Sequence, residues 1–190
     1  MATNRGAMGG AVFFENAGFS TFFNNTLLRN QAGRGGGVYS GDGTDGIALV
    51  NNVVAFCSSG VTTSNSVQFR HNCVFGNGTN NFVGWPDPTG IDGNLSVDPQ
   101  FIENPEFGTA HMKSDSPCRD AGDTGVAQAD WLDINGGARV RGVAVDIGAE
   151  ESGDLVRWDT VATNTGPRFE WTEPEPAVAP ARFFRATSQP

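Results

Sequence analysis

The sequence repeats a six-residue motif four times, as FFNNTL at residues 22–27, LVNNVV at 49–54, FRHNCV at 69–74 and IDGNLS at 91–96. Each copy has an apolar first residue and an asparagine in its fourth position. These asparagines are 27, 20 and 22 residues apart, which is within the range of coil lengths in solenoid proteins. A second pattern keeps the same order, because GGAVF precedes the first copy and GGGVY precedes the second. The two recurring motifs predict a repeat architecture.

Stacked coils give both halves of the motif a physical reason. Parallel strands about 4.8 Å apart place equivalent residues above one another, so the apolar positions form columns that make the core. An asparagine repeated at an inward turn donates its side-chain amide to a neighbouring coil and tolerates left-handed backbone geometry. We therefore expect a structural ladder at Asn25, Asn52, Asn72 and Asn94. The alternative role for these amides is direct contact with sugars.

The composition favours strands and turns over helices. The 190 residues include 26 glycines, and only 17% of the residues are charged. We predict an all-β protein, with a right-handed parallel β-helix of about four coils over residues 1–104. A loop-rich closing cap over residues 105–151 and a short β-rich tail of hairpins over residues 152–190 complete the predicted organisation.

The charge balance excludes some partners. The net charge is −9, and Lys113 is the only lysine, so no basic stripe is present to neutralise phosphates. We expect no nucleic-acid partner. No stretch approaches the roughly 20 apolar residues that span a bilayer, so we also expect no transmembrane segment.

The start of the chain has no covering element over the first coil. Neither an amphipathic helix nor a polar segment precedes it, although terminal solenoid repeats normally have caps. Uncovered strand edges pair with other strands. We therefore expect either a fragment that lacks its first coils or a homo-oligomer that associates through this end. An export signal is also expected to be missing, because residues 1–10 lack an apolar signal-peptide core.

The longest coil carries two acids among glycines, in SGDGTDG at residues 40–46. Asp42 and Asp45 are candidates for acid–base chemistry or for holding a hard cation such as Ca²⁺. Ca²⁺ prefers six or more oxygens, and the loop lacks the twelve-residue Ca²⁺-binding pattern. Ca²⁺ is therefore a weak candidate, and we expect a solvated turn that needs no cofactor.

A polar pair stands beside the third ladder asparagine. Arg70 and His71 are expected at a solvent-facing corner, where they would serve proton transfer or sugar contact. The predicted catalytic set is Asp42, Asp45, Arg70 and His71. Hydrolysis of a glycosidic bond needs two flanking carboxyl groups. The other acids near coil loops are Asp92, Asp98 and Glu15, and nothing in the sequence makes the acids converge.

Aromatic residues mark the loop at residues 76–90. Trp85 and Phe82 are the predicted carbohydrate-binding residues, because an aromatic ring stacks on the apolar face of a sugar. The alternative is that Trp85 folds back over the core.

The three cysteines carry no recognisable metal motif. Cys57, Cys73 and Cys118 form no Cys-x-x-Cys pair and no ligand spacing with either histidine. We expect buried thiols, with one disulfide left open as an alternative.

Four segments follow the last coil. They read VDPQF at 97–101, HMKSDSPCRDAGD at 111–123, DINGGARV at 133–140 and VDIGAE at 145–150. In order and spacing, residues 9–151 resemble the C-terminal region of bacterial extracellular right-handed β-helix proteins, the group labelled choice-of-anchor Q. The resemblance implies a pectate-lyase-like solenoid, secreted or attached to a bacterial cell surface, with polysaccharide or a cell-surface glycan as its partner.

The closing segments are expected to seal the end of the stack through turns and ion pairs. This expected cluster consists of Asp120, Asp123, Asp133, Arg139 and Asp146. His111 is expected to be structural. Arg119 replaces an apolar residue of the family pattern and Glu150 replaces a tyrosine, which puts the packing of the cap in question.

These observations lead to two functional hypotheses. The first is an extracellular or surface-associated β-helical module that contacts polysaccharide without catalysis, since solenoids commonly present long binding faces. The alternative is a carbohydrate-active enzyme, a polysaccharide lyase or glycoside hydrolase, with its site on the coil loops. Clustering of Asp42, Asp45 and Arg70 in one groove would favour the enzyme.

Overall fold

The computed structural model describes residues 3–64, 66–102 and 111–151, all of which belong to one compact unit. Within them, twelve short strands form four sheets, and the one helix is a 3₁₀ turn, η1 (Thr124–Val126). The predicted tail over residues 152–190 lies outside the described residues.

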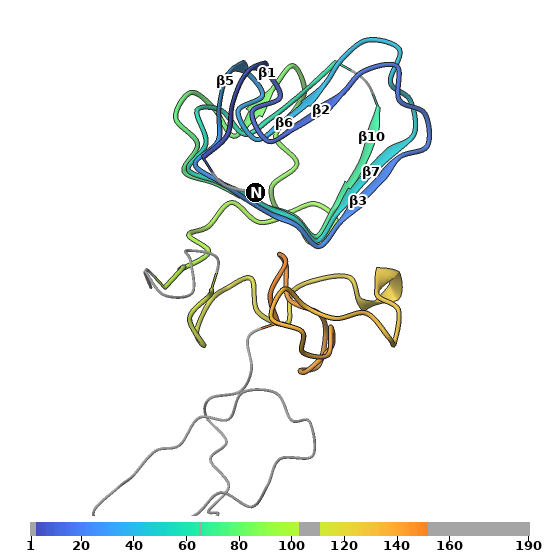
Figure 1. Cartoon of the computed structure of the whole chain (residues 1–190), viewed down its shortest axis with the longest axis vertical. Coiled ribbons are helices and arrows are strands. Elements are labelled where there is room, and N and C mark those ends of the chain that lie inside the picture. Colours follow the sequence, from blue (N-terminus) through green and yellow to red (C-terminus); the bar gives the residue numbers. More distant parts are fainter. Residues whose placement is uncertain (1–2, 65, 103–110, 152–190) are drawn as a thin grey trace, which may run out of the picture. The chain divides into compact units, whose positions relative to one another are not determined.

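Three sheets form the walls of a solenoid (Figure 1). The first wall consists of β2 (Val12–Phe14), β6 (Val38–Ser40), β9 (Val61–Thr63) and β12 (Phe82–Val83). The second consists of β3 (Thr21–Phe23), β7 (Ile47–Val50) and β10 (Val67–Arg70), and the third of β4 (Thr26–Leu28), β8 (Val53–Ala55) and β11 (Cys73–Phe75). A fourth sheet pairs β1 (Arg5–Met8) with β5 (Gln31–Arg34).

Every strand pairing in these sheets is parallel, and the register follows the sequence repeat. Phe22 pairs with Leu49, and Leu49 pairs in turn with Phe69, so the first residues of three motif copies stack in one column. The fourth copy contributes a bridge between Leu95 and Cys73. The described coils therefore form a parallel β-helix, as the repeats predict, with about three turns rather than the expected four.

Each coil turns at two corners, and both corners have the same backbone arrangement. A residue in the left-handed conformation comes just before a residue that forms hydrogen bonds to the next coil. At the first corner the left-handed residues are Asn24, Asn51, His71 and Asp92, with φ angles from 49° to 57°. At the second they are Thr3, Arg29, Phe56 and Gly76, with φ angles from 54° to 62°. This conformation costs a non-glycine residue roughly 1–2 kcal/mol, so the hydrogen bonds of the following residue must hold each corner.

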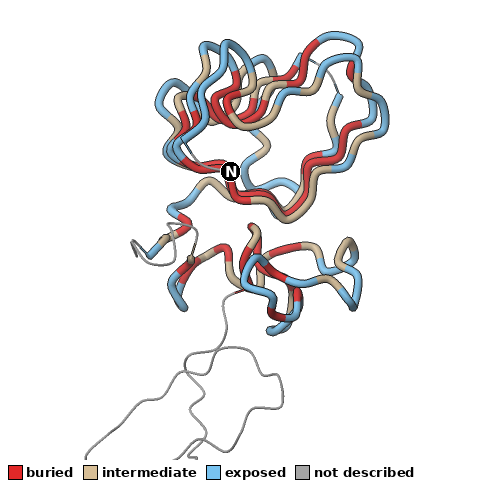
Figure 2. Tube along the Cα trace, in the orientation of Figure 1, coloured by how far each residue is buried: buried red, intermediate tan, exposed pale blue. Residues whose placement is uncertain are grey.

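The core lies inside the coils, and Figure 2 shows buried positions running along the walls. In β8, Val54 faces this interior, whereas its neighbours Val53 and Ala55 face outward yet are equally buried. A second apolar cluster covers them, with contributions from Met112, Cys118 and Ile147. Neighbouring residues of a strand point to opposite faces, so the third wall is a sheet buried on both sides.

The segment at residues 111–151 supplies the outer cover of the third wall. The N–H of Ala149 donates to Oγ1 of Thr26 in β4, and the N–H of Gly148 donates to the carbonyl of Asn51. We expected this segment to seal the end of the stack, but the described residues lie along its side. The reason is the outward apolar face of Leu28, Val53 and Cys73, which would otherwise be exposed to water.

Candidate functional site

The four repeated asparagines form a ladder at the first corner. The backbone N–H and the side-chain amide of Asn25 both donate to Oδ1 of Asn52, at 3.0 and 3.1 Å. Asn52 donates in the same way to Asn72, at 2.9 and 3.0 Å. The N–H of Asn72 donates to Oδ1 of Asn94 at 2.9 Å. Bonds between coils therefore occupy these amides, which assigns them to the fold rather than to sugar contact.

A second ladder runs along the other corner and was missed in the sequence. Asn4 donates its N–H and its amide to Oδ1 of Asn30, and the N–H of Cys57 donates to Oδ1 of Asn77 at 2.9 Å. Cys57 holds the place of an asparagine, with its sulfur 4.0 Å from Nδ2 of Asn30. The signal was present, because a polar residue or cysteine follows each of the first three ladder asparagines by five positions.

Arg70 and His71 contact the 111–151 segment. Nε of Arg70 lies 3.0 Å from Oδ2 of Asp123, and Nδ1 of His71 lies 2.9 Å from the carbonyl oxygen of Ala121. The Arg70 guanidinium lowers the pKa of the Asp123 carboxyl below its usual range. Asp123 is also fixed by Asn51, whose Oδ1 accepts its N–H at 2.7 Å. This pair therefore joins the segment to the coils.

Asp42 and Asp45 lie at the opposite end of the second wall from Arg70. Asp45 precedes β7 by two residues, whereas Arg70 pairs with Val50, the last residue of β7. The strand from Ile47 to Val50 alone separates these positions by about 10 Å. Both acids are exposed, and Oδ1 of Asp42 accepts a bond from the Ser64 hydroxyl at 3.3 Å. The structure does not bring the four predicted catalytic residues together.

The expected turn-and-ion-pair cluster is present in part within the 111–151 segment, because Asp123 pairs with Arg70 instead and Glu151 is the ion-pair partner of Arg139. Nη1 of buried Arg139 lies 3.3 Å from Oε1 of Glu151, and Nη2 donates to the carbonyl of Asp146 at 3.0 Å. Oδ1 of Asp146 accepts the N–H of Asp120, and Oδ1 of Asp133 accepts those of two residues in its own turn. Burial raises the pKa of Glu151 to about 7, because desolvation outweighs the attraction of Arg139.

Glu150 and Arg119, which differ from the pattern that the closing segments resemble, both make polar contacts. Glu150 is buried and accepts the N–H of Met112 through Oε2 at 2.8 Å, while its other oxygen bonds to Nδ1 of His111. Arg119 pairs with Asp120 at 3.6 Å and donates to the carbonyl of Ser114. His111 therefore has a structural partner.

Trp85 lies partly over the core. Its ring makes edge contacts with Phe69 and Phe82, at centroid distances of 5.1 and 5.4 Å. Its Nε1 is buried without a hydrogen-bond partner. Trp85 is half-buried, so its ring has one side against the core and the remainder toward a recess.

That recess, called here the Trp85 recess, has a volume of about 350 Å³ and runs beside β10, an edge strand of the second wall. Its lining is Val67, Gln68, Phe69, Arg70, Trp85, Pro88, Ile91 and Asp92. Gln68 and Asp92 are exposed, whereas Phe69 is buried. The structure therefore unites Arg70 and Trp85, two predicted site residues, and adds Gln68 and Ile91, which the sequence did not single out.

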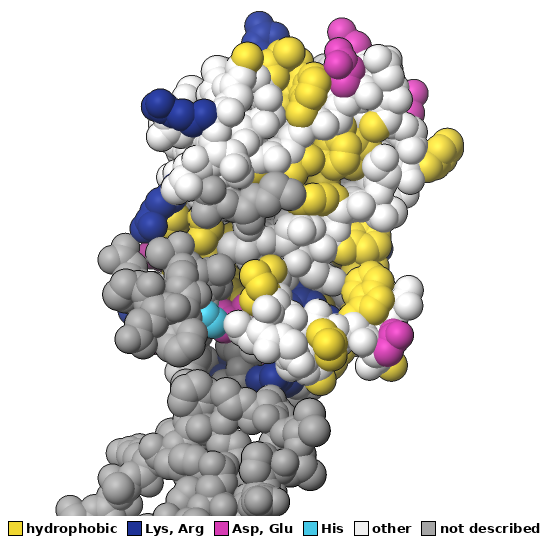
Figure 3. All heavy atoms as spheres, in the orientation of Figure 1, with side chains coloured by type: hydrophobic (Ala, Val, Ile, Leu, Met, Phe, Trp, Pro, Cys, Tyr) yellow, Lys and Arg dark blue, Asp and Glu magenta, His cyan; other side chains and the backbone are white. Residues whose placement is uncertain are grey.

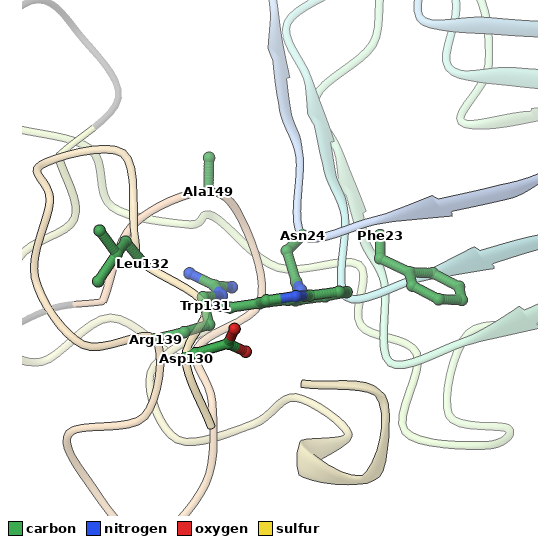
Figure 4. Close-up of a pocket in the computed structure, with 7 residues that line it drawn as sticks. All are labelled: Phe23, Asn24, Asp130, Trp131, Leu132, Arg139 and Ala149. Carbon is green, nitrogen blue, oxygen red and sulfur yellow. The ribbon is translucent and has the colours of Figure 1, made fainter. Parts of the chain in front are cut away.

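A second recess, the Trp131 recess, has a volume of about 420 Å³. Its lining is Phe23, Asn24, Asp130, Trp131, Leu132, Arg139 and Ala149. Figure 4 shows the indole of Trp131 projecting toward the corner at Asn24. The polar groups here are largely engaged, because Oδ1 of Asn24 accepts from Asn51 at 3.0 Å and Arg139 belongs to the buried cluster.

The described surface offers few centres for chemistry. Among residues 3–64, 66–102 and 111–151, no group of three or more histidine, cysteine, aspartate or glutamate side chains could hold a metal ion. No helix in this part of the chain is long and apolar enough to cross a membrane. On the face in Figure 3 the arginine and lysine side chains lie apart from one another, while hydrophobic side chains gather in patches.

Comparisons with protein-family models, with curated proteins and with solved structures found no match. The function therefore has to be argued from the recesses and the residues that line them.

Proposed function

We propose that this chain is an extracellular or cell-surface β-helical module that contacts polysaccharide without cleaving it, and that the Trp85 recess is its sugar-binding site. One observation carries the proposal: a half-buried aromatic ring shares a concave site with exposed polar side chains. The placement outside the cell is supported by the resemblance of the closing segments to those of bacterial extracellular β-helix proteins.

The recess has the two kinds of surface that a sugar ring requires. Trp85, Pro88 and Ile91 supply apolar surface for the C–H groups of the ring. Gln68 and Asp92 supply an amide and a carboxylate for hydroxyl groups. The volume of about 350 Å³ is at the lower end of the range for small-ligand sites, so it suits one or two sugar units of a longer chain.

The same residues argue against hydrolysis or elimination at this site. Hydrolysis needs two carboxyl groups on opposite sides of the bond, and Asp92 is the one carboxylate in the described lining. Arg70 would be the base for a lyase, but its ion pair with Asp123 stabilises the protonated guanidinium. Binding without turnover is the function that this arrangement supports best.

A polysaccharide panel tests the proposal, with and without Ca²⁺, by affinity electrophoresis together with assays for new reducing ends and unsaturated products. We expect retention on at least one polysaccharide and no product. Gln68→Ala and Asp92→Asn should each weaken binding, and Trp85→Phe should weaken it about tenfold, because phenylalanine keeps the core contact but loses part of the stacking face.

Asp45→Asn is the matched control, since it removes an exposed acid at the opposite end of the second wall. It should leave binding unchanged. Turnover that disappears in Asp45→Asn would establish the enzyme alternative and overturn the proposal. Absence of binding across the panel, or binding that is insensitive to all three recess variants, would also contradict it.

A further inference from the structure

Two of the three cysteines meet between the third wall and its cover. Cys73 lies in β11 and faces outward, and Cys118 lies in the covering segment. Both are fully buried in the same apolar cluster, where the two thiols lie close enough to perturb each other's pKa. Cys57 belongs instead to the interior cluster, on the other side of the third wall. The fold thus selects one pair among the three thiols.

We propose that Cys73 and Cys118 are oxidised to a disulfide that fastens the 111–151 segment to the outer face of the third wall. The two thiols are free in this structure. Both positions are held by backbone contacts: the N–H of Cys73 donates to the carbonyl of Asn52 at 2.8 Å, and the carbonyl of Cys118 accepts the N–H of Ile147 at 2.8 Å. The inference is independent of sugar binding.

The two thiols perturb each other's pKa once they are buried together. In the folded structure the interaction with Cys118 lowers the pKa of Cys73, whereas that interaction and burial raise the pKa of Cys118. Thiolates are the nucleophiles of disulfide exchange, and exchange precedes burial of the pair, so either cysteine can attack first.

The oxidant is a disulfide of the surroundings, either a small-molecule disulfide or that of a thiol oxidoreductase. The thiolate of one cysteine attacks one of its sulfurs, which forms a mixed disulfide and releases the other sulfur as a thiol. The thiolate of the other cysteine then attacks the cysteine sulfur of this mixed disulfide and releases the second thiol. Two cysteine protons and two electrons pass to the oxidant. Because both side chains are buried, exchange takes place during folding, before the segment covers the wall.

Refolding of the full chain tests the pair. The denatured, reduced protein is refolded in a mixture of oxidised and reduced glutathione, alkylated at free thiols, and digested with trypsin without reduction. We expect the loss of two hydrogen atoms in the intact mass and a cross-link between the peptides His71–Lys113 and Ser114–Arg119, with Cys57 alkylated in the peptide Gly35–Arg70. A protein that remains fully reduced, or a cross-link that contains Cys57, would overturn the proposal.

Thermal unfolding supplies a second measurement. The bond would close a loop of about 45 residues, so the oxidised form should have a Tm higher by about 10 °C than the same protein after reduction. Cys118→Ala should show no such difference between the two buffers. An equal Tm for the oxidised and reduced wild-type proteins would contradict a bond that fastens the segment.

Discussion

At the scale of single residues, the fold depends on corners that combine a strained residue with a bonding residue. His71 adopts a left-handed conformation immediately before Asn72, and Asp92 does so two residues before Asn94. The hydrogen bonds of the two asparagines compensate for the conformational cost of these left-handed residues. Asn72 has the most complete set of bonds. Its Oδ1 accepts two bonds from Asn52, and its amide donates to the carbonyls of Leu49 and Arg70.

Asn72→Ala should therefore be strongly destabilising. The substitution leaves the buried N–H of Asn52 and the carbonyl of Leu49 without these partners, at a cost of about 3 kcal/mol in the free energy of unfolding. Urea denaturation measures this change. Asn80→Ala is the control, because the Asn80 side chain is exposed, and it should change stability by less than about 0.5 kcal/mol. Equal stability of the two variants would show that the ladder contributes little.

The residue scale also shows why one ladder was predictable and the other was not. The first has asparagine in every coil, so alignment of the repeats reveals it. In the second, Cys57 interrupts the series, and Asn77 bonds onward to Asn81, only four residues later in the chain. Because asparagine and cysteine both occur at this hydrogen-bonding position, it gives a weaker sequence pattern than a column of apolar residues.

At the scale of elements, the main feature is the 111–151 segment against the third wall. Its motifs identified it as a closing structure, but motifs do not specify which surface is covered. The decisive residues are in the strands, since both Val53 and Val54 of β8 are apolar and point to opposite faces. Consecutive apolar residues in a strand indicate burial on both sides. The apolar run in β8 therefore indicates that another segment packs on the outer face of the third wall rather than on the end of the stack.

Asp123→Asn tests the polar contact between this segment and the coils. The folded pKa of Asp123 is lowered, so its ion pair with Arg70 contributes stability above the unfolded pKa, near 4, and that contribution is lost as the pH falls through the lower folded pKa. We expect the variant to be less stable than wild type by about 1 kcal/mol at pH 7, with the difference shrinking as the pH falls below 4. Asp45→Asn, which removes an exposed acid at the opposite end of the second wall from Arg70, is the control variant in the same thermal-unfolding series.

Glu151→Gln tests the buried cluster around Arg139. The stability contribution of Glu151 should depend on pH in the opposite direction to that of Asp123. A folded pKa of about 7, above the ordinary value of 4.5, means that the folded state retains this proton where the unfolded state has released it. Glu151 should therefore make wild-type stability fall as the pH rises from about 4.5 to 7. The variant should lack this pH-dependent loss of stability. Subtracting its curve of unfolding free energy against pH from that of the wild type isolates the contribution of Glu151. Parallel curves for the two proteins would contradict the assignment.

At the scale of the whole molecule, the solenoid places distant residues in one site. Arg70, Trp85 and Asp92 belong to successive parts of the last coils and meet at the edge of β10. The sequence supported Trp85 and Arg70 as separate candidates, but their common recess depends on how loop 84–92 folds over the edge, and no repeat encodes that path. Asp42 and Asp45 were equally plausible in the sequence and lie at the far end of the wall. Association through the first coil stays a prediction, for which light scattering is the measurement.

The most direct test of sugar contact at the Trp85 recess is the indole N–H resonance of Trp85 in a ¹⁵N-labelled sample, assigned among the four tryptophans with Trp85→Phe. The sample is titrated with an oligosaccharide from the polysaccharide that the panel selects. We predict that the Trp85 resonance shifts progressively to saturation while that of Trp131 stays in place. A shift of the Trp131 resonance with no change at Trp85 would contradict it.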